Sequence, residues 1–285
     1  MQKVFEELTT AFRRAGGEIS YAAFERIVRK HATLFEDTET IFMLLQASGY
    51  PIEEAAAGFR LRTMFTPWRQ ERYCIVDIET NGSKPGRSQV IEIGAVMLEE
   101  DKIVDRFETY VACAYLPEHI IKLTGIEPVD LADAPSRKEA LTALRHFLGD
   151  AVFTAHNAGF DHSFLNASFQ RFGLGPIGNP VLCTIDLARR TFESERYGLA
   201  YLNESLGLGM QAHHRAYNDA LAASKVLEKS FETVPAEVVT TDELLQFAKS
   251  SRKERSEKKR KKSKAKQKKD EAPRRAHSSK SSVER

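Results

Sequence analysis

Cysteine is scarce in this sequence, and no apolar run is long enough to cross a bilayer. The three cysteines, Cys74, Cys113 and Cys183, are scattered through apolar stretches. This pattern excludes a cysteine zinc site and favours reduced thiols. The amphipathic first residues lack the apolar core of a signal peptide. These absences predict a cytoplasmic protein that has no membrane partner.

Charge is divided unevenly along the chain. Residues 249–285 contain 17 Lys and Arg against 5 Asp and Glu, whereas residues 1–248 contain 25 basic and 35 acidic side chains. The basic end has almost no apolar residue with which to offset the entropy of ordering, so we predict a disordered tail. Such a tail binds polyanions at low salt, and we favour nonspecific nucleic-acid tethering over a merely solubilising role.

Residues 1–70 are predicted to form a small helical module. Apolar residues at helical spacing indicate three helices, the third over residues 36–49, and residues 50–62 have the strand–turn–strand pattern of a wing. The module resembles a winged helix-turn-helix domain. Its expected recognition helix has three acids near its start and no Lys or Arg, although phosphate contacts need cations. We therefore favour a packing or protein-docking module over a duplex-binding one.

Residues 71–233 alternate strands with helices, and residues 234–285 add a short helix over 241–250 before the basic tail. The elements expected in the middle region are a strand over 73–80, a hairpin over 89–111 that turns at Glu100 and Asp101, a strand and helix from 151, a strand over 180–190 and a final helix over 219–231. This order predicts an α/β fold with a mixed β-sheet flanked by helices.

Acidic residues occupy places where apolar ones would be expected. Asp77 and Glu79 lie two apart in the first strand of the middle region, so they point to one face and repel each other. Asp161 follows the next strand segment, and Asp219 begins the last helix, which Asn218 could cap. Four carboxylates brought together would supply the hard oxygen ligands that Mg²⁺ or Mn²⁺ prefers.

A histidine precedes the last of these acids. His214 and Asp219 are five residues apart, a turn of about 140° along a helix, so they would not share a helical face. We therefore expect His214 on the loop before the helix, where it can act as a general base. His213 is adjacent, and the spacing to Asp219 favours His214.

Three short motifs carry a specific resemblance. They are "DIET" with Asp77 and Glu79, "HNAGFD" ending at Asp161, and "HRAYND" with His214 and Asp219. In this order they resemble the exonuclease motifs of the DEDD superfamily, and His-x4-Asp is typical of its DEDDh branch. The nearest resemblance is to the proofreading subunit of bacterial replicative DNA polymerase and its free-standing relatives. One departure is Asn81, where Thr is commoner.

The resemblance implies a ribonuclease-H-like fold and phosphodiester hydrolysis with two divalent cations, Mg²⁺ or Mn²⁺. It implies that Asp77 bridges both ions and that Glu79 and Asp219 complete the site of the attacking water. Asp161 would help to hold the other ion, and His214 would take the proton. The product would be a nucleoside 5′-monophosphate.

The resemblance also implies a set of substrate-binding residues. "KLTGI" (122–126) matches a further family element, which would meet the terminal nucleotides through Thr124 and through Ile126 as an apolar wedge against a base. Thr80 and Asn157 complete the set. On the residues alone, Asn157 and its neighbour His156 are expected to orient the strand end rather than bind metal.

Three functions stay open on the sequence. We favour a DNA 3′–5′ exonuclease for proofreading or repair, acting on single-stranded DNA or a frayed 3′ end. An RNA-trimming exonuclease is the alternative, because the metal ligands act on the phosphate and base or sugar contacts decide the substrate. An inactive nucleic-acid-binding module is less favoured, since every active-site position is chemically competent. A DNA polymerase partner is an analogy only.

Overall fold

The structure is a computed structural model that describes residues 1–31, 37–209 and 214–250. The predicted disorder of the basic tail and the neighbour His213 therefore lie outside the described residues. No helix in the described part of the chain is both long and apolar enough to cross a membrane.

The N-terminal module, residues 1–70, contains three helices and a small antiparallel sheet with the strand order β1-β3-β2. Its elements are α1 (Gln2–Arg14), β1 (Glu18–Ser20), α2 (Tyr21–His31), α3 (Thr38–Ala47), β2 (Ile52–Ala55) and β3 (Gly58–Leu61). The predicted helices and the wing hairpin β2–β3 are confirmed. The third strand, β1, was not predicted, because it pairs with β3, a segment far away in the sequence.

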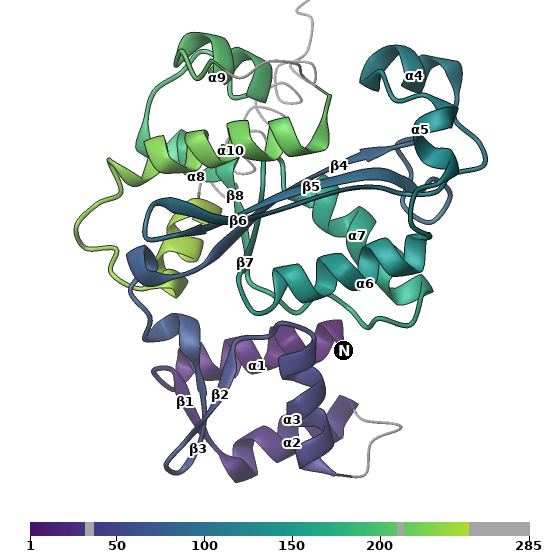
Figure 1. The fold of residues 1–285 in the computed structure, drawn as a ribbon. Coiled ribbons are helices and arrows are strands. Elements are labelled where there is room, and N and C mark those ends of the chain that lie inside the picture. The colour runs from purple at the N-terminus through teal and green to yellow at the C-terminus, as the bar shows by residue number, and fades with distance from the viewer. Residues whose placement is uncertain (32–36, 210–213, 251–285) are drawn as a thin grey trace, which may run out of the picture.

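The middle region forms a five-stranded mixed sheet in the order β6-β5-β4-β7-β8 (Figure 1). Its strands are β4 (Tyr73–Thr80), β5 (Val90–Glu99), β6 (Lys102–Tyr110), β7 (Val152–Ala155) and β8 (Val181–Cys183). β4 pairs antiparallel with β5 and parallel with β7. The hairpin β5–β6 turns at Glu100 and Asp101, both of which have positive φ. The predicted mixed sheet is confirmed.

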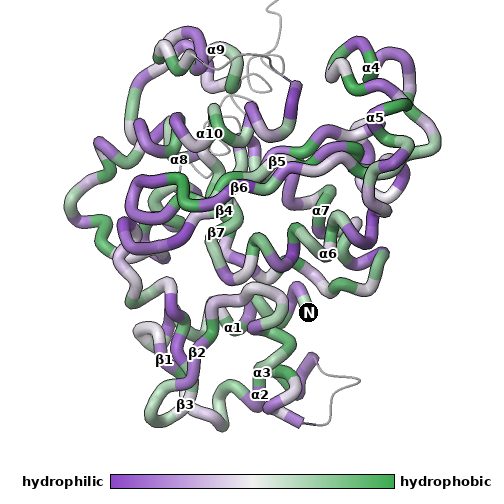
Figure 2. Tube along the Cα trace, viewed as in Figure 1, coloured by the Kyte–Doolittle hydropathy of each residue, from purple (hydrophilic) through white to green (hydrophobic). Residues whose placement is uncertain are grey.

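Helices cover both faces of this sheet. They are α4 (Glu118–Thr124), α5 (Pro128–Ala132), α6 (Arg137–Leu148), α7 (Gly159–Arg171), α8 (Thr184–Thr191), α9 (Leu199–Ser205) and α10 (Ala216–Phe231). Figure 1 shows α6 and α7 on one side of the sheet and α10 on the other. β5 is buried almost throughout, as a strand with both faces covered should be, and Figure 2 shows that the central strands are mostly hydrophobic.

Two expectations of local structure are wrong. The strand expected over 180–190 ends at Cys183, and α8 follows at once, because Leu187 and Ala188 are buried on one face of a helix. The last helix begins at Ala216 with Arg215 as its N-cap, so Asn218 lies inside the first turn and does not cap it.

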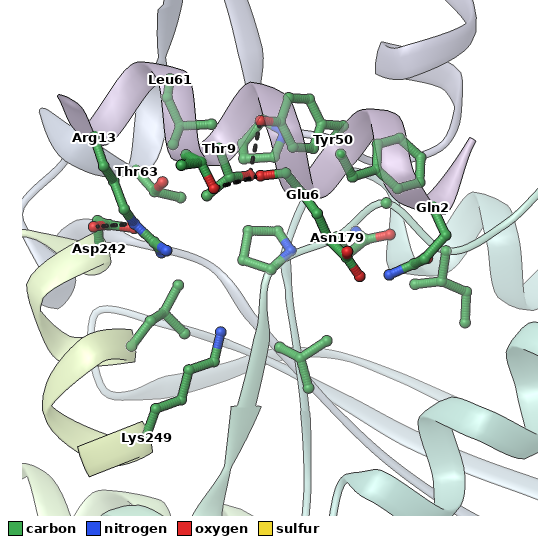
Figure 3. A pocket seen from close by; sticks show the side chains of 18 of the residues that line it. Gln2, Glu6, Thr9, Arg13, Tyr50, Leu61, Thr63, Asn179, Asp242 and Lys249 are labelled. Carbon is green, nitrogen blue, oxygen red and sulfur yellow. Dashed lines mark hydrogen bonds and ion pairs between the residues drawn. The ribbon is translucent and has the colours of Figure 1, made fainter. Parts of the chain in front are cut away.

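The C-terminal segment joins the N-terminal module to the sheet. The predicted helix over 241–250 is confirmed, and its residue Leu244 is buried with Tyr73 and Phe231 in the core of the sheet. Arg13 on α1 makes a 2.6 Å ion pair with Asp242 (Figure 3). We call this contact region between the module and residues 234–250 the junction. The division of the chain at residues 70 and 233 stays a prediction.

Candidate active site

Four acids from three elements form one cluster, which we call the acidic cluster: Asp77 and Glu79 on β4, Asp161 on α7 and Asp219 on α10. Asp77 and Glu79 are half-buried, and Asp161 is only 3% exposed. Asp161 lies in the first turn of α7, a few residues beyond the strand end where we expected it. The sequence motifs thus come together at one place in the fold.

Burial and crowding raise the pKa of Asp77 well above its ordinary range. Loss of hydration is the largest cause, followed by the negative charges of Asp161, Asp219, Glu79 and Glu92. Burial and the surrounding charge thus disfavour the ionised form of this carboxyl group, and a bound cation would favour it.

Glu79 shows the same effect. Burial first, and then the charges of Asp219, Glu92 and Asp161, raise the pKa of Glu79 to about 8, while the cation of Arg215 acts in the opposite direction. Burial also raises the pKa of Asp161 to about 7, against hydrogen bonds from backbone N–H groups that favour the ionised form. The acidic cluster is therefore costly to ionise without added positive charge.

A glycine brings α10 close to the sheet. Gly94 on β5 pairs with Asp77 on β4, and a Cβ atom at Gly94 would lie 2.1 Å from the backbone nitrogen of Tyr217 on α10. Any larger residue would push the helix away. Because the helix crosses β5 here, its first turn places Asp219 beside the two acids of β4.

His214 lies on the loop before α10, as predicted. Its backbone adopts φ 68°, and its N–H donates a 3.0 Å hydrogen bond to the carboxylate of Asp219. One potential ligand atom each of Glu79, His214 and Asp219 lies within 4.8 Å of the others. The exposed imidazole therefore stands next to Glu79 and Asp219 of the acidic cluster.

The comparisons with known proteins agree with this geometry. Residues 74–227, more than half of the chain, match the family model RNase_T, described as exonuclease. The chain belongs to this exonuclease family. The membership of the DEDD 3′–5′ exonucleases that the three motifs predict is confirmed.

The related proteins are much longer than this exonuclease. DNA polymerase III PolC-type of Staphylococcus haemolyticus is 37% identical over 164 residues, which cover 56% of this chain and 11% of that protein. The PolC-type polymerase of Staphylococcus aureus strain RF122 is 38% identical over 160 residues, again 11% of its length. The similarity therefore concerns one segment of each polymerase.

Solved structures of exonuclease I share the fold. E. coli exonuclease I in complex with a dT13 oligonucleotide aligns with a TM-score of 0.51 at 18% identity, covering 56% of this exonuclease and 40% of that chain. Another exonuclease I structure aligns with a TM-score of 0.54 at 17% identity, covering 62% and 43%. The ribonuclease-H-like fold implied by the sequence is confirmed.

The substrate-binding residues expected in this exonuclease differ in their exposure to solvent. Asn157 is exposed at the turn between β7 and α7, with φ 74°. Thr80 and Thr124 are 9% and 5% exposed, and their hydroxyls donate to the carbonyls of Gly82 and Ile120. Both threonines thus stabilise local turns here, and their contact with substrate stays a prediction.

Ile126 does not have the exposure of a wedge. It is 1% exposed and packs against Ile91, Ile120 and Leu131, because the chain turns inward after the left-handed Gly125 that ends α4. Ile126 is thus covered by its own chain here, and its contact with a base stays a prediction. Leu123, on the same segment, is 50% exposed.

His156 orients its loop, as expected. Its Nε2 lies 2.9 Å from the carbonyl of Tyr197, to which it donates, and its Nδ1 accepts from the hydroxyl of Thr184 at 2.8 Å. Burial lowers the pKa of His156 to about 4, so the ring is neutral. It joins two loops of the exonuclease and leaves no ring nitrogen for a metal.

Glu92 and Arg215 also lie at the site, although the motifs did not predict a role for either residue. Glu92 is 1% exposed on β5 and bonds to Arg215, which lies between His214 and α10. The signal was present in the sequence, because Glu92 interrupts the apolar run of β5 in the same way that Asp77 interrupts β4.

The acidic cluster fits divalent cations. Its donors are carboxylate oxygens, which hard cations prefer, and the raised pKa of Asp77 shows how much its ionised form would gain from positive charge. In this exonuclease Asp77, Glu79, Asp161 and Asp219 are the residues that could hold such ions, with His214 at their margin.

Proposed function

We propose that this chain is a metal-dependent exonuclease that removes nucleotides from the 3′ end of DNA, single-stranded or frayed, in proofreading or repair. The observation that carries the proposal is the acidic cluster with His214 beside it, in a chain of the exonuclease family. The DNA polymerase names of the relatives support DNA as the substrate. Association with a DNA polymerase is part of the proposal, on the same support.

The residues divide the chemistry among them. Asp77, Glu79, Asp161 and Asp219 would hold the divalent cations, Mg²⁺ or Mn²⁺. Two such ions would stabilise the attacking and leaving oxygens of an in-line displacement at phosphorus. His214 accepts the proton of the attacking water at a ring nitrogen and returns it to solvent. The bond between phosphorus and the 3′ oxygen of the preceding nucleotide breaks, that oxygen takes up a proton from solvent, and a nucleoside 5′-monophosphate leaves.

Contacts with the substrate are a further part of the proposal. Asn157 and the exposed Leu123 flank the proposed path of the terminal nucleotides, and the basic tail retains the polymer near the site by phosphate contacts. The tail adds affinity without adding sequence preference, since phosphate contacts carry no base information.

The test is a substrate panel with purified protein. Single-stranded DNA, a primer–template with a 3′ mismatch and RNA of the same sequence, each labelled at the 5′ end, are incubated with Mg²⁺ or with Mn²⁺. We expect shortening from the 3′ end, fastest on the DNA strands, and release of nucleoside 5′-monophosphates. The Asp77→Asn protein, prepared in parallel, controls for contaminating nucleases.

Two outcomes would contradict the proposal. Faster trimming of RNA than of DNA would indicate that the protein is an RNA-trimming exonuclease. Binding of all three substrates without any hydrolysis would indicate a nucleic-acid-binding module. A 3′-phosphorothioate linkage, which should slow the reaction, gives an independent check that the terminal phosphodiester is the bond attacked.

A further inference from the structure

Glu92 is a fifth carboxylate beside the acidic cluster, and it is buried. It pairs directly with Glu79 in the register of β4 and β5, and it is 1% exposed. Its oxygens already have partners. Oε1 accepts from Arg215 Nε at 3.0 Å and Nη2 at 2.9 Å, and Oε2 accepts from the backbone N–H of Ala216 at 3.0 Å. Glu92 is therefore engaged with protein groups and differs in kind from an open metal ligand.

Arg215 connects three parts of the fold. It is the N-cap residue of α10, adjacent to His214, and its guanidinium bonds to Glu92 on β5. Its Nη2 also donates to the hydroxyl of Tyr110 on β6 at 2.8 Å. The residue next to the proposed base is thus attached to two strands, neither of which carries a predicted ligand.

The attachment has a specific consequence for the site. Oε2 of Glu92 holds the N–H of Ala216 in the first turn of α10, and that turn carries Asp219. Asp219 in turn accepts the backbone N–H of His214. Loss of either hydrogen bond would therefore displace His214, the proposed base, and Asp219, the proposed metal ligand, together.

The backbone of His214 supports the same conclusion. A residue other than glycine with φ 68° adopts a sparsely populated conformation, which persists only where neighbouring contacts over-determine it. The contacts that surround it are the bond to Asp219 on one side and the Arg215–Glu92 pair on the other. Gly94, which lets α10 approach the sheet closely, also determines how near the first turn of α10 lies to β5.

We propose that Glu92 and Arg215 are positioning residues, a clamp between β5 and α10 that sets His214 and Asp219 against Glu79. The inference rests on the proposed function, because it treats His214 as the base and Asp219 as a metal ligand. The clamp touches neither substrate nor metal. It acts by holding the loop before α10 in a fixed position beside β4.

The test compares two arginines, each of which pairs with a buried glutamate. Arg215→Lys preserves the charge but loses the two-pronged contact with Glu92. Arg62→Lys is the matched control, since Arg62 bonds at 2.7 Å to Glu71, which is also 1% exposed but lies at the start of the sheet away from the acidic cluster. Each variant is measured for thermal stability, for Mn²⁺ affinity by calorimetry without substrate, and for kcat and KM on single-stranded DNA.

We expect the two variants to separate. Arg215→Lys should lower kcat and Mn²⁺ affinity by about 10–100-fold, the usual effect of removing a group that orients a ligand, with KM for DNA little changed. Arg62→Lys should lose as much thermal stability as Arg215→Lys does, but it should retain wild-type kcat and Mn²⁺ affinity. A wild-type kcat and Mn²⁺ affinity in Arg215→Lys, or an equal loss in Arg62→Lys, would overturn the clamp.

Failure of the clamp can be distinguished from failure of the proposed function. If the wild-type protein hydrolyses none of the substrates, the proposed function fails, while the calorimetric comparison still decides whether the clamp shapes the ion site. If Arg215→Lys does not fold, Tyr110→Phe becomes the deciding variant, since it removes only the outer 2.8 Å bond. Weaker Mn²⁺ binding in Tyr110→Phe then supports the clamp, and unchanged binding overturns it.

Discussion

The junction and the active site treat buried acids in opposite ways. At the junction and the start of the sheet, Asp242 and Glu71 are 7% and 1% exposed, and each has an arginine partner, Arg13 or Arg62. In the acidic cluster, carboxylates face one another, and their mutual repulsion together with burial raises the pKa of Asp77. The same residue type is thus paired with arginine in one region and gathered with other carboxylates in the other.

The difference shows what makes an acid functional here. A buried carboxylate costs several kcal/mol unless it is paired, so a fold that only needed stability would pair every one. The acidic cluster keeps this unfavourable free energy, which a bound divalent cation would offset. Glu92 is the intermediate case, since Arg215 neutralises it while it lies next to Glu79. Four changes test the contrast.

The largest expected effect comes from Asp77→Asn. This change should abolish hydrolysis, because it removes the residue proposed to hold both ions, and leave metal-free stability unchanged or higher, because it relieves repulsion. Arg62→Ala should do the reverse, lowering the free energy of unfolding on the order of 3 kcal/mol with hydrolysis retained at low temperature. Denaturant unfolding and oligonucleotide degradation measure both. Activity in the Asp77→Asn protein would refute the metal assignment.

His214→Ala separates proton transfer from metal binding. We expect kcat to fall by about 10²–10⁴-fold, the usual range for loss of a general base, while Mn²⁺ affinity remains close to wild type. Calorimetry with Mn²⁺ and single-turnover hydrolysis measure the two quantities. A large loss of affinity would make His214 a ligand instead, and a greater loss of rate in His213→Ala would show that the neighbouring histidine is the base.

Metal-free stability should fall as pH rises. The pKa of Glu79 is raised to about 8 and that of Asp161 to about 7, so the folded state binds protons that the unfolded state has released. The stabilisation is complete below about pH 4, the ordinary range of these groups, and is lost as pH rises to about 8. We expect a loss on the order of 1 kcal/mol or more in unfolding experiments in EDTA. Saturating Mg²⁺ should abolish this trend, and a trend of the opposite sign would contradict the raised pKa values.

Removal of the tail should have the smallest effect on chemistry. Truncation after Ser250 leaves the helix over 241–250 and its packing intact, whereas truncation from Lys249 would cut into it. DNA binding should weaken, and the slope of log affinity against log salt should fall by about 0.7 for each lost contact with a single strand. Turnover at saturating oligonucleotide should not change. A fall in that turnover would place the tail in the catalytic machinery.

Local spacing was sufficient to predict much of this molecule. Asp77 and Glu79 share a strand face because side chains alternate, and His214 precedes α10 because five residues cannot share a helical face with Asp219. The helices and wing of the N-terminal module follow from periodicity in the same way. The order of the motifs, together with the family they resemble, was sufficient to predict the ribonuclease-H-like fold.

Tertiary contacts decided the rest, because burial and pairing depend on residues that are distant in sequence. Nothing in "LTGI" indicates that Ile126 is covered by Ile91, and nothing near Glu92 indicates Arg215, which is 123 residues away. A strand as short as β8 is stable only because β7 lies beside it. The sequence by itself determined which acids could bind metal, since residue type and local period set their chemistry and direction. Only the folded chain determined which acids pair with an arginine and which lie beside other carboxylates.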